Sequence, residues 1–195
     1  MKARLTVKDQ KGRSESPWNV GDHIKMILWG ITWTLLYRPS PRPFHAWRRM
    51  LLKLFGCKIS GKPNLYPTSI IKMPWHLTME DGSCLGDRCE VYNLGEVVLK
   101  KMSTVSQHAY LCGGTHDLSK KNTPLIVGEI VLGEEVFIGA KAIILPGIHI
   151  GDGAVIGAGA VVTKDMPEWM ICAGNPCKPI KPREFEGRTK EQDLG

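Results

Sequence analysis

The sequence lacks any hydrophobic run long enough to cross a membrane. The most apolar stretch, Met26–Tyr37, spans twelve residues, whereas a membrane-spanning helix needs about 20. The opening segment, Met1–Ser16, is polar and charged, so we expect no signal peptide. The chain is not short of apolar residues in general, because 43% of its residues are hydrophobic and 23% are charged. This balance is typical of a folded protein and excludes wholesale disorder.

Cysteine is also scarce. Six cysteines in 195 residues are too few for a disulfide scaffold. Cys84 and Cys89 are five residues apart, as are Cys172 and Cys177, so neither pair has the two-residue gap of a zinc knuckle. We therefore expect small buried thiols, no metal site and a location in the reducing cytosol.

Glycine, in contrast, is abundant, and most of the 21 glycines follow residue 80. This clustering predicts many backbone positions without a Cβ in the second half of the chain. The formal net charge of +7 favours anionic partners, although the sequence contains no recognised nucleic-acid-binding module. We divide the chain into a polar tail (1–16), an N-terminal helical extension (17–62), a repeat region with a loop at about 117–125 (63–167), and a C-terminal extended segment and tail (168–195).

The helical extension predicts two helices. The first begins with Ser16 as its N-cap and Pro17 in its first turn. Its aliphatic residues recur at steps of three and four, which predicts a stripe that packs on an apolar surface: Val20, Ile24, Ile27, Leu28, Ile31 and Leu35. The second helix spans about Phe44–Phe55 and ends at Gly56. Two interpretations stay open: the hairpin packs against the protein's own body or a neighbouring subunit, or it lies shallowly at a membrane surface, with Trp and basic residues at headgroup level.

The strongest pattern is a six-residue repeat that begins at Ile126. Every sixth residue is aliphatic: Ile126, Leu132, Ile138, Ile144, Ile150, Ile156 and Val162. A weaker version, interrupted by a slip of two residues, runs from Met79 to Leu111. A helix of period 3.6 cannot hold a strict period of six, whereas six residues suit a short strand and a corner. Three such units close a triangular coil, and successive coils pair as parallel strands. The sequence therefore predicts an all-β solenoid, a parallel β-helix of hexapeptide repeats.

Four motifs accompany the repeat: Pro74–Trp75, Tyr110–Asp117, Val162–Asp165 and Ala173–Lys178. In these motifs the chain resembles the hexapeptide-repeat acyltransferases, and more narrowly the colanic-acid-type O-acetyltransferases of bacterial exopolysaccharide synthesis. The resemblance implies a left-handed parallel β-helix and a homotrimer with clefts between neighbouring prisms. It also implies acetyl-CoA as the acyl donor substrate and a sugar as the acceptor.

His116 is the best-placed candidate for a catalytic residue. Acyl transfer from a thioester to a hydroxyl needs a base that takes the hydroxyl proton. His116 closes the hexad begun by Leu111, at an outward corner, and Gly113 and Gly114 would let the backbone approach a ligand closely. The resemblance implies that His116 is this general base. Asp117 either holds the other imidazole nitrogen or makes a turn in the loop, and the sequence leaves both roles open.

Further residues are candidates for substrate and cofactor binding. His108, one hexad before His116, and Asn93, at the slip in the repeat, are candidate acceptor contacts. The resemblance implies that pantetheine lies along a prism edge near Gly139–Ala140 and Gly157–Ala158. It also implies that basic residues surround the CoA phosphates, namely Lys164, Lys178 and Lys181, with Arg183 as a weaker candidate.

The function implied by the resemblance is acetyl-CoA-dependent O-acetylation of a sugar hydroxyl in bacterial polysaccharide biosynthesis. The alternatives are N-acetylation of an amino sugar, a γ-carbonic anhydrase-like metal protein, and a non-catalytic assembly protein. A γ-carbonic anhydrase needs three histidines, and no third histidine falls at a fitting position beside His108 and His116. We expect the reaction in the cytoplasm, at the inner face of the cell membrane if the N-terminal hairpin contacts it.

Overall fold

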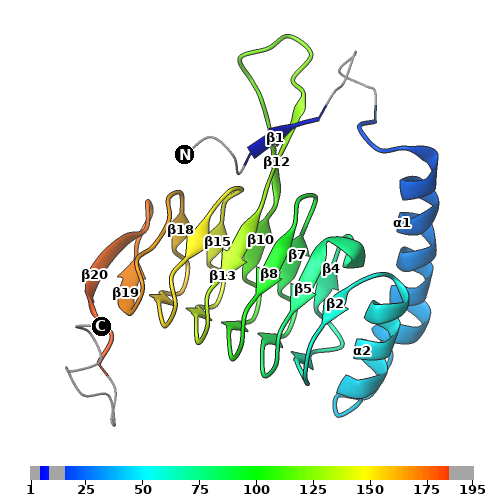
Figure 1. Cartoon of the computed structure of the whole chain (residues 1–195), viewed down its shortest axis with the longest axis horizontal. Helices are drawn as coiled ribbons and strands as arrows, with labels where there is room; N and C mark the ends of the chain where they lie inside the picture. Colours follow the sequence, from blue (N-terminus) through cyan, green and yellow to red (C-terminus); the bar gives the residue numbers. More distant parts are fainter. Residues whose placement is uncertain (1–4, 9–15, 185–195) are drawn as a thin grey trace.

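The computed structural model describes residues 5–8 and 16–184. Its body is a three-walled prism of short strands that lies along the long axis of the molecule, with two helices at one end (Figure 1). The first wall contains β2 (Lys58–Ile59), β5 (Leu77–Met79), β8 (Val97–Leu99), β13 (Ile130–Leu132) and β16 (His149–Ile150). The second wall contains β3 (Asn64–Leu65), β6 (Cys84–Leu85), β9 (Thr104–Val105), β14 (Phe137–Ile138), β17 (Val155–Ile156), β19 (Met170–Ala173) and β20 (Lys178–Pro182). The third wall contains β4 (Ile70–Ile71), β7 (Glu90–Tyr92), β10 (Tyr110–Cys112), β15 (Ile143–Ile144) and β18 (Val161–Val162).

The chain visits the walls in the same order in every coil, so the strands of each wall pair in parallel, except that β20 runs antiparallel to β19. We call the turn from the first wall to the second the first corner, that from the second to the third the second corner, and that from the third back to the first the third corner. This arrangement is the left-handed parallel β-helix predicted from the sequence.

The strand register confirms the six-residue repeat from Leu132 onward, whereas Ile126, its predicted first position, lies outside the prism walls and pairs with Val7 and Thr115. Leu132 pairs with Ile150, Ile138 with Ile156, and Ile144 with Val162. The residues of each pair are 18 positions apart, which is three hexads, and all six side chains are at most 2% exposed. The hexad positions therefore stack as aliphatic columns inside the prism, where burial of apolar surface drives folding.

The weaker repeat in the first half has a simple origin. Leu65 pairs with Leu85, and Leu85 pairs with Val105. In both pairs the partner lies 20 residues further along the chain. These coils are two residues longer than three hexads. Their third corner holds the extra residues, including the short 3₁₀-helix η2 (Pro74–His76).

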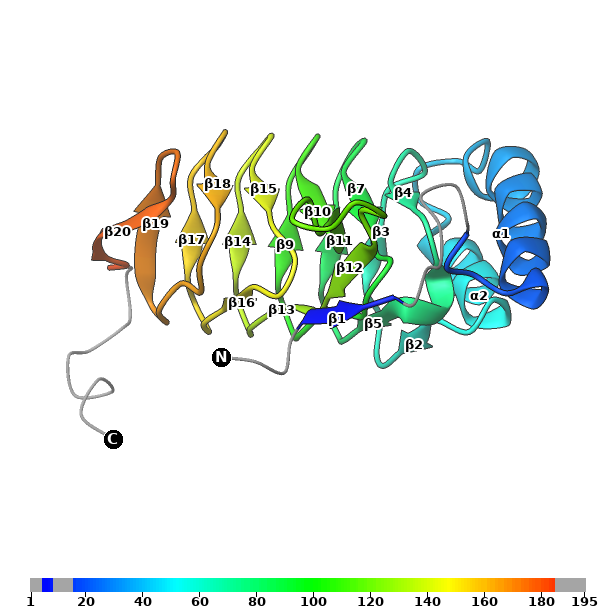
Figure 2. The same ribbon diagram turned by 90° about the horizontal axis from the view of Figure 1, so that it is seen from above.

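The N-terminal helices close the open end of the prism (Figure 2). They are α1 (Val20–Thr32), which continues into a π-helical turn η1 (Trp33–Tyr37), and α2 (His45–Leu54). Their side chains bond to the first coil. Trp29 donates to the Ile71 carbonyl at 2.7 Å, and Trp33 to the Ser69 carbonyl at 3.0 Å. Because the first coil has no preceding coil to pair with, these indole groups satisfy carbonyls that would otherwise lack a strand partner.

The orientation of α1 corrects one sequence prediction. The aliphatic stripe that begins at Val20 does not pack on the body of this chain, because its six side chains are 51–76% exposed. The face that packs inward carries Trp29, which is 3% exposed, and Tyr37, which is fully buried. The indole N–H groups can bond to the end of the sheet and aliphatic groups cannot, so the aromatic side turns inward. The helix starts after Asn19, whose side chain accepts from the Asp22 N–H, and not after Ser16.

A β-hairpin interrupts the prism at the third corner. It consists of β11 (Gly114–His116) and β12 (Leu125–Gly128), which pair antiparallel. The N-terminal strand β1 (Leu5–Val7) lies along the other side of β12, although we expected this part of the chain to be only a polar tail. The three strands project from the body as a small separate sheet (Figure 1).

Within the described ranges, no helix is long and apolar enough to cross a membrane.

Candidate functional site

The hairpin presents His116 to solvent. His116 ends β11, where it pairs with Leu125, and its side chain is exposed. The two glycines before it serve packing. A Cβ on Gly113 would lie 2.8 Å from the Tyr92 carbonyl oxygen, and one on Gly114 would lie 2.8 Å from the Leu94 side chain. The glycines therefore let the hairpin base sit tightly on the preceding coil, instead of making room for a ligand as the sequence had led us to expect.

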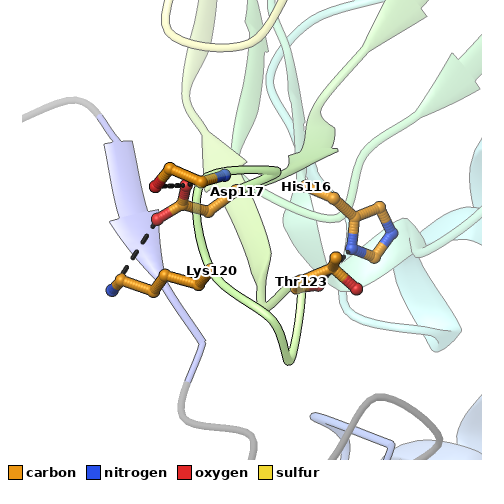
Figure 3. Close-up of polar contacts among 5 residues, drawn as sticks. His116, Asp117, Lys120 and Thr123 are labelled. Atoms are coloured by element: carbon orange, nitrogen blue, oxygen red, sulfur yellow. Dashed lines mark hydrogen bonds and ion pairs between the residues drawn. The ribbon is translucent and has the colours of Figure 1, made fainter.

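The imidazole of His116 is held by the far side of its own loop. Its Nδ1 lies 2.9 Å from the carbonyl oxygen of Thr123 (Figure 3). A carbonyl oxygen can only accept, so Nδ1 carries the proton in this contact and Nε2 keeps a lone pair. This is the tautomer that a general base requires.

Asp117 takes the loop role and not the orienting role. Its carboxylate accepts from the N–H and hydroxyl of Ser119, at 3.1 and 2.6 Å, and lies 3.7 Å from Lys120 Nζ. Figure 3 shows it directed away from the His116 imidazole. The Ser119 hydrogen bonds, helped by the charge of Lys120, hold the pKa of Asp117 below its usual value. Of the two roles left open for Asp117, the structure shows the loop role, and the Thr123 carbonyl is the partner of the imidazole.

The two candidate acceptor contacts differ in their surroundings. His108 is exposed at the second corner, at the opposite end of β10 from the hairpin. Asn93 is fully buried. Its side-chain oxygen accepts from the Met73 N–H at 2.9 Å, and its side-chain nitrogen donates to the Met73 carbonyl. Asn93 therefore joins two coils where the regular ladder is interrupted, and we no longer include it among the acceptor contacts.

This placement makes a testable prediction for Asn93. Replacement by alanine leaves a buried N–H and a buried carbonyl of Met73 without partners, so the free energy of unfolding should fall by about 2–3 kcal/mol. The KM for the acceptor should stay the same. Urea unfolding and steady-state kinetics on Asn93→Ala measure both quantities, with a substitution at the exposed Lys101, Lys101→Gln, as the surface control. A raised acceptor KM at unchanged stability would restore Asn93 to the binding site.

The predicted cofactor residues line up along the second corner. A Cβ on Gly139 would lie 2.6 Å from Ala158 N, and one on Gly157 would lie 2.9 Å from the Cβ of Ala173. Lys178 pairs with Ala173 across β19 and β20. Ala140 and Ala158 are half-buried and exposed respectively. The glycines thus let successive coils approach closely along one edge of small residues, which we call the cofactor edge: Gly139, Ala140, Gly157, Ala158, Ala173 and Lys178.

The other predicted basic residues lie elsewhere. Lys164 is exposed at the third corner, one wall away from the cofactor edge. Lys181 pairs with Ile171, further along the second wall. Arg183 donates to the carbonyls of Glu135 and Gly153 at the first corner, at 3.0 and 2.8 Å. Among the four predicted basic residues, Lys178 is the one that lies on the cofactor edge of its own chain. Arg183 instead binds backbone carbonyls and closes the last coil.

Sequence reasoning overlooked a second lysine on this edge. Lys141 is exposed at the second corner and its N–H donates to the Gln107 carbonyl, just as the His108 N–H donates to the Asp87 carbonyl. Both residues have a left-handed φ near +60° and so occupy equivalent positions in successive coils. His108 and Lys141 each come directly before the small buried residue of their hexad. This position in the repeat is visible in the sequence and could have identified Lys141 as a residue of the second corner.

No group of three or more His, Cys, Asp or Glu residues in 5–8 and 16–184 is arranged to hold a metal ion. Two features make up the candidate site. One is the exposed His116 on the hairpin, and the other is the cofactor edge with its exposed lysines, Lys141 and Lys178.

Comparison with known proteins identifies the family. A model described as the hexapeptide repeat of succinyl-transferase matches residues 129–164. A protein described as a colanic acid biosynthesis acetyltransferase, WcaF of Escherichia coli strain K12, is 37% identical over 163 residues, which cover 84% of this chain and 90% of that protein.

Two solved structures share the fold. A maltose O-acetyltransferase from Clostridium difficile 630 has a TM-score of 0.73 at 25% identity, covering 83% of this chain and 88% of that one. A galactoside acetyltransferase solved in complex with coenzyme A has a TM-score of 0.73 at 24% identity, covering 87% and 86%. The similarity to WcaF over most of both chains and the match to the hexapeptide-repeat model show that the chain belongs to the hexapeptide-repeat acetyltransferases, the family that its sequence motifs resemble.

Proposed function

We propose that this protein transfers the acetyl group of acetyl-CoA to a hydroxyl of a sugar in bacterial polysaccharide biosynthesis, with His116 as the general base. The observation that carries the proposal is the contact between His116 Nδ1 and the Thr123 carbonyl. It leaves Nε2 as the basic nitrogen, on an exposed side chain that an acceptor can reach. The similarity, over 84% of this chain, to an acetyltransferase named for colanic acid biosynthesis supports a saccharide acceptor.

In the proposed reaction, Nε2 of His116 takes the proton of the acceptor hydroxyl as its oxygen attacks the thioester carbonyl carbon. The carbon–sulfur bond then breaks, the acetyl group stays on the sugar oxygen, and the imidazolium returns its proton to the departing thiolate. The Thr123 carbonyl accepts the Nδ1 hydrogen both in the neutral imidazole and in the imidazolium. It therefore stabilises the imidazolium while Nε2 carries the proton of the acceptor.

The cofactor edge suits the donor substrate. The N–H groups of Gly139 and Gly157 already donate to the next coil, so pantetheine must bond to other backbone groups of these corners. Lys141 and Lys178 place two exposed cations on the same edge, where they can bind phosphate. We propose these two residues, with a lesser contribution from Lys164 and Lys181, as the contacts of the CoA phosphates.

The separation of the two halves of the site supports a homotrimer. The cofactor edge is at the start of the third wall, and the His116 hairpin leaves its end. A strand advances about 3.3 Å per residue, so the path from Ala142 to Pro146 alone puts about 13 Å between them. A hydroxyl and a thioester must be in contact to react. We propose that His116 of one chain faces the cofactor edge of a neighbour, which a closed ring of identical chains would repeat.

We also propose that the reaction takes place in the cytoplasm. All six cysteines are free, and burial raises the pKa of Cys57 to about 12 and that of Cys172 to about 11. Unpaired, unreactive thiols suit a reducing compartment.

Calorimetric titration of acetyl-CoA tests the donor. We expect one saturable site per chain, and about two- to fivefold weaker binding by Lys178→Gln, because an exposed charge pair contributes about 0.4–1 kcal/mol. Lys101→Gln, an exposed lysine at the first corner, is the matched control and should bind as the wild type does. Absence of binding to the wild type would overturn the proposal, while equal binding by both variants would remove Lys178 from the site.

A further inference from the structure

The helical end of the molecule exposes an unusually continuous apolar surface. We call it the docking face, and it consists of Val20, Ile24, Ile27, Leu28, Ile31, Leu35 and Leu36 of α1 and η1. These side chains are 47–76% exposed. Figure 2 shows α1 at the far end of the prism, on the outside of the molecule. Folded proteins rarely leave a contiguous aliphatic stripe in water unless it binds something.

The body of the protein holds this face outward. The opposite side of α1 is attached by the hydrogen bonds of Trp29 and Trp33 to the first coil, and Trp29 also packs against Tyr37 and Phe55. Turning the aliphatic side inward would leave the carbonyls of Ile71 and Ser69 without these donors and would expose the two indole rings to water. Exposure of the stripe is therefore a property of the folded chain.

The positive charge of the protein is concentrated in the same segment. Residues 17–62 contain eight Lys and Arg and one acidic residue, Asp22, which is a formal +7 and equals the net charge of the whole chain. The remainder of the chain is therefore formally neutral. One of the eight, Arg48, is buried. Lys25, Lys53 and Lys58 are exposed, and on α2 a shallow hollow combines Lys53 and Arg49 with Met50 and Leu54.

We propose that the docking face lies on the surface of an anionic lipid bilayer, with the aliphatic stripe in the interface and the basic residues at the phosphate level. An exposed apolar helix face in a segment rich in Lys and Arg is the composition that binds such surfaces. The 13 residues of α1 extend about 20 Å, too short for the roughly 30 Å of a bilayer core but suitable for lying in its plane. A second copy of the chain is a poorer occupant, because it would bring two segments of formal +7 together.

Vesicle sedimentation tests the docking. The full chain is mixed with vesicles of phosphatidylcholine alone and with vesicles that also contain phosphatidylglycerol. We expect binding to the mixed vesicles that weakens as salt is raised, and little binding to phosphatidylcholine alone. The double variant Ile27→Glu/Ile31→Glu should bind the mixed vesicles about tenfold more weakly or worse. Met102→Glu is its control, because Met102 is 61% exposed, as against 63% for Ile27, but lies on the prism.

A charge variant tests the second half of the proposal. Lys53→Gln/Lys58→Gln should bind the mixed vesicles about tenfold more weakly, whereas Lys101→Gln should bind them as the wild type does. Acetyl-CoA binding should be the same in all these variants, which separates a loss of docking from a loss of folding or of the proposed function.

Three results would overturn the proposal. These are absence of wild-type binding to anionic vesicles, equal binding to neutral vesicles, and undiminished binding by the isoleucine variant. A smaller assembly mass for the isoleucine variant in solution, without vesicle binding by the wild type, would assign the face to a second copy of the chain instead.

Discussion

His116→Ala should lower the turnover number by about 10²–10⁴-fold, the contribution of a positioned general base, while acetyl-CoA binding is unchanged. The side chain is exposed and its polar contact is with the Thr123 carbonyl. Its removal leaves no buried group without a partner, so the protein should unfold at nearly the wild-type temperature. Release of CoA in the presence of a saccharide acceptor measures the rate.

The turnover number at saturating substrates distinguishes a base from a merely structural residue. Loss of a base should lower the turnover number alone, whereas loss of a structural residue should also lower stability or acetyl-CoA binding. His108→Ala provides the matched control, because His108 is also exposed but lies at the other end of β10. Full activity of His116→Ala, with the loss appearing in His108→Ala, would transfer the role to His108.

Arg48→Met should have the largest effect on stability, about 3 kcal/mol or more in the free energy of unfolding. Arg48 is fully buried in α2. Its guanidinium donates to the Leu65 carbonyl at 2.8 Å, the Ser40 hydroxyl at 2.8 Å, and the Pro41 carbonyl at 2.9 Å. It also donates to the Arg42 carbonyl. Methionine fills similar space but leaves these acceptors without donors, and it detaches the turn before α2 from the first coil.

Its neighbour Arg49 offers the control. Arg49 is half-buried and donates to the Pro63 carbonyl at 3.0 Å, so Arg49→Met should cost about 1 kcal/mol or less. Denaturant unfolding at equilibrium measures both variants, and equal slopes would show that the same structure unfolds in each. Similar losses for both arginines would mean that the carbonyl cage around Arg48 does not stabilise the helical end.

The prism could be predicted because its signal is a steric requirement repeated many times. Each coil needs an aliphatic residue inside each wall, so Leu132, Ile138 and Ile144 recur one coil later as Ile150, Ile156 and Val162. No other regular structure accommodates a period of six. The small residues Ala142, Ala154 and Ala160, four places after an aliphatic position, are buried as well.

The details of the site could not be predicted in this way, because they depend on where single side chains point. Nothing in the order His116–Asp117 distinguishes an acid beside the imidazole from one turned toward Ser119. Asn93 is polar at a break in the repeat, which suits a ligand contact and a bridge between coils equally well. Only the folded chain shows that the Met73 backbone lies within bonding distance of Asn93.

The sequence by itself therefore determined the architecture, the position of the interruption that carries His116, and the amphipathic character of the first helix. The tertiary structure alone decided which side of that helix faces the body, which group holds the imidazole, and which lysines share an edge. The physical reason is that periodicity reports which residues share a face, whereas hydrogen bonds between distant segments decide where that face turns. At the helical end, the carbonyls of an unpaired first coil bind the indole groups of Trp29 and Trp33, and the aliphatic side is left facing outward.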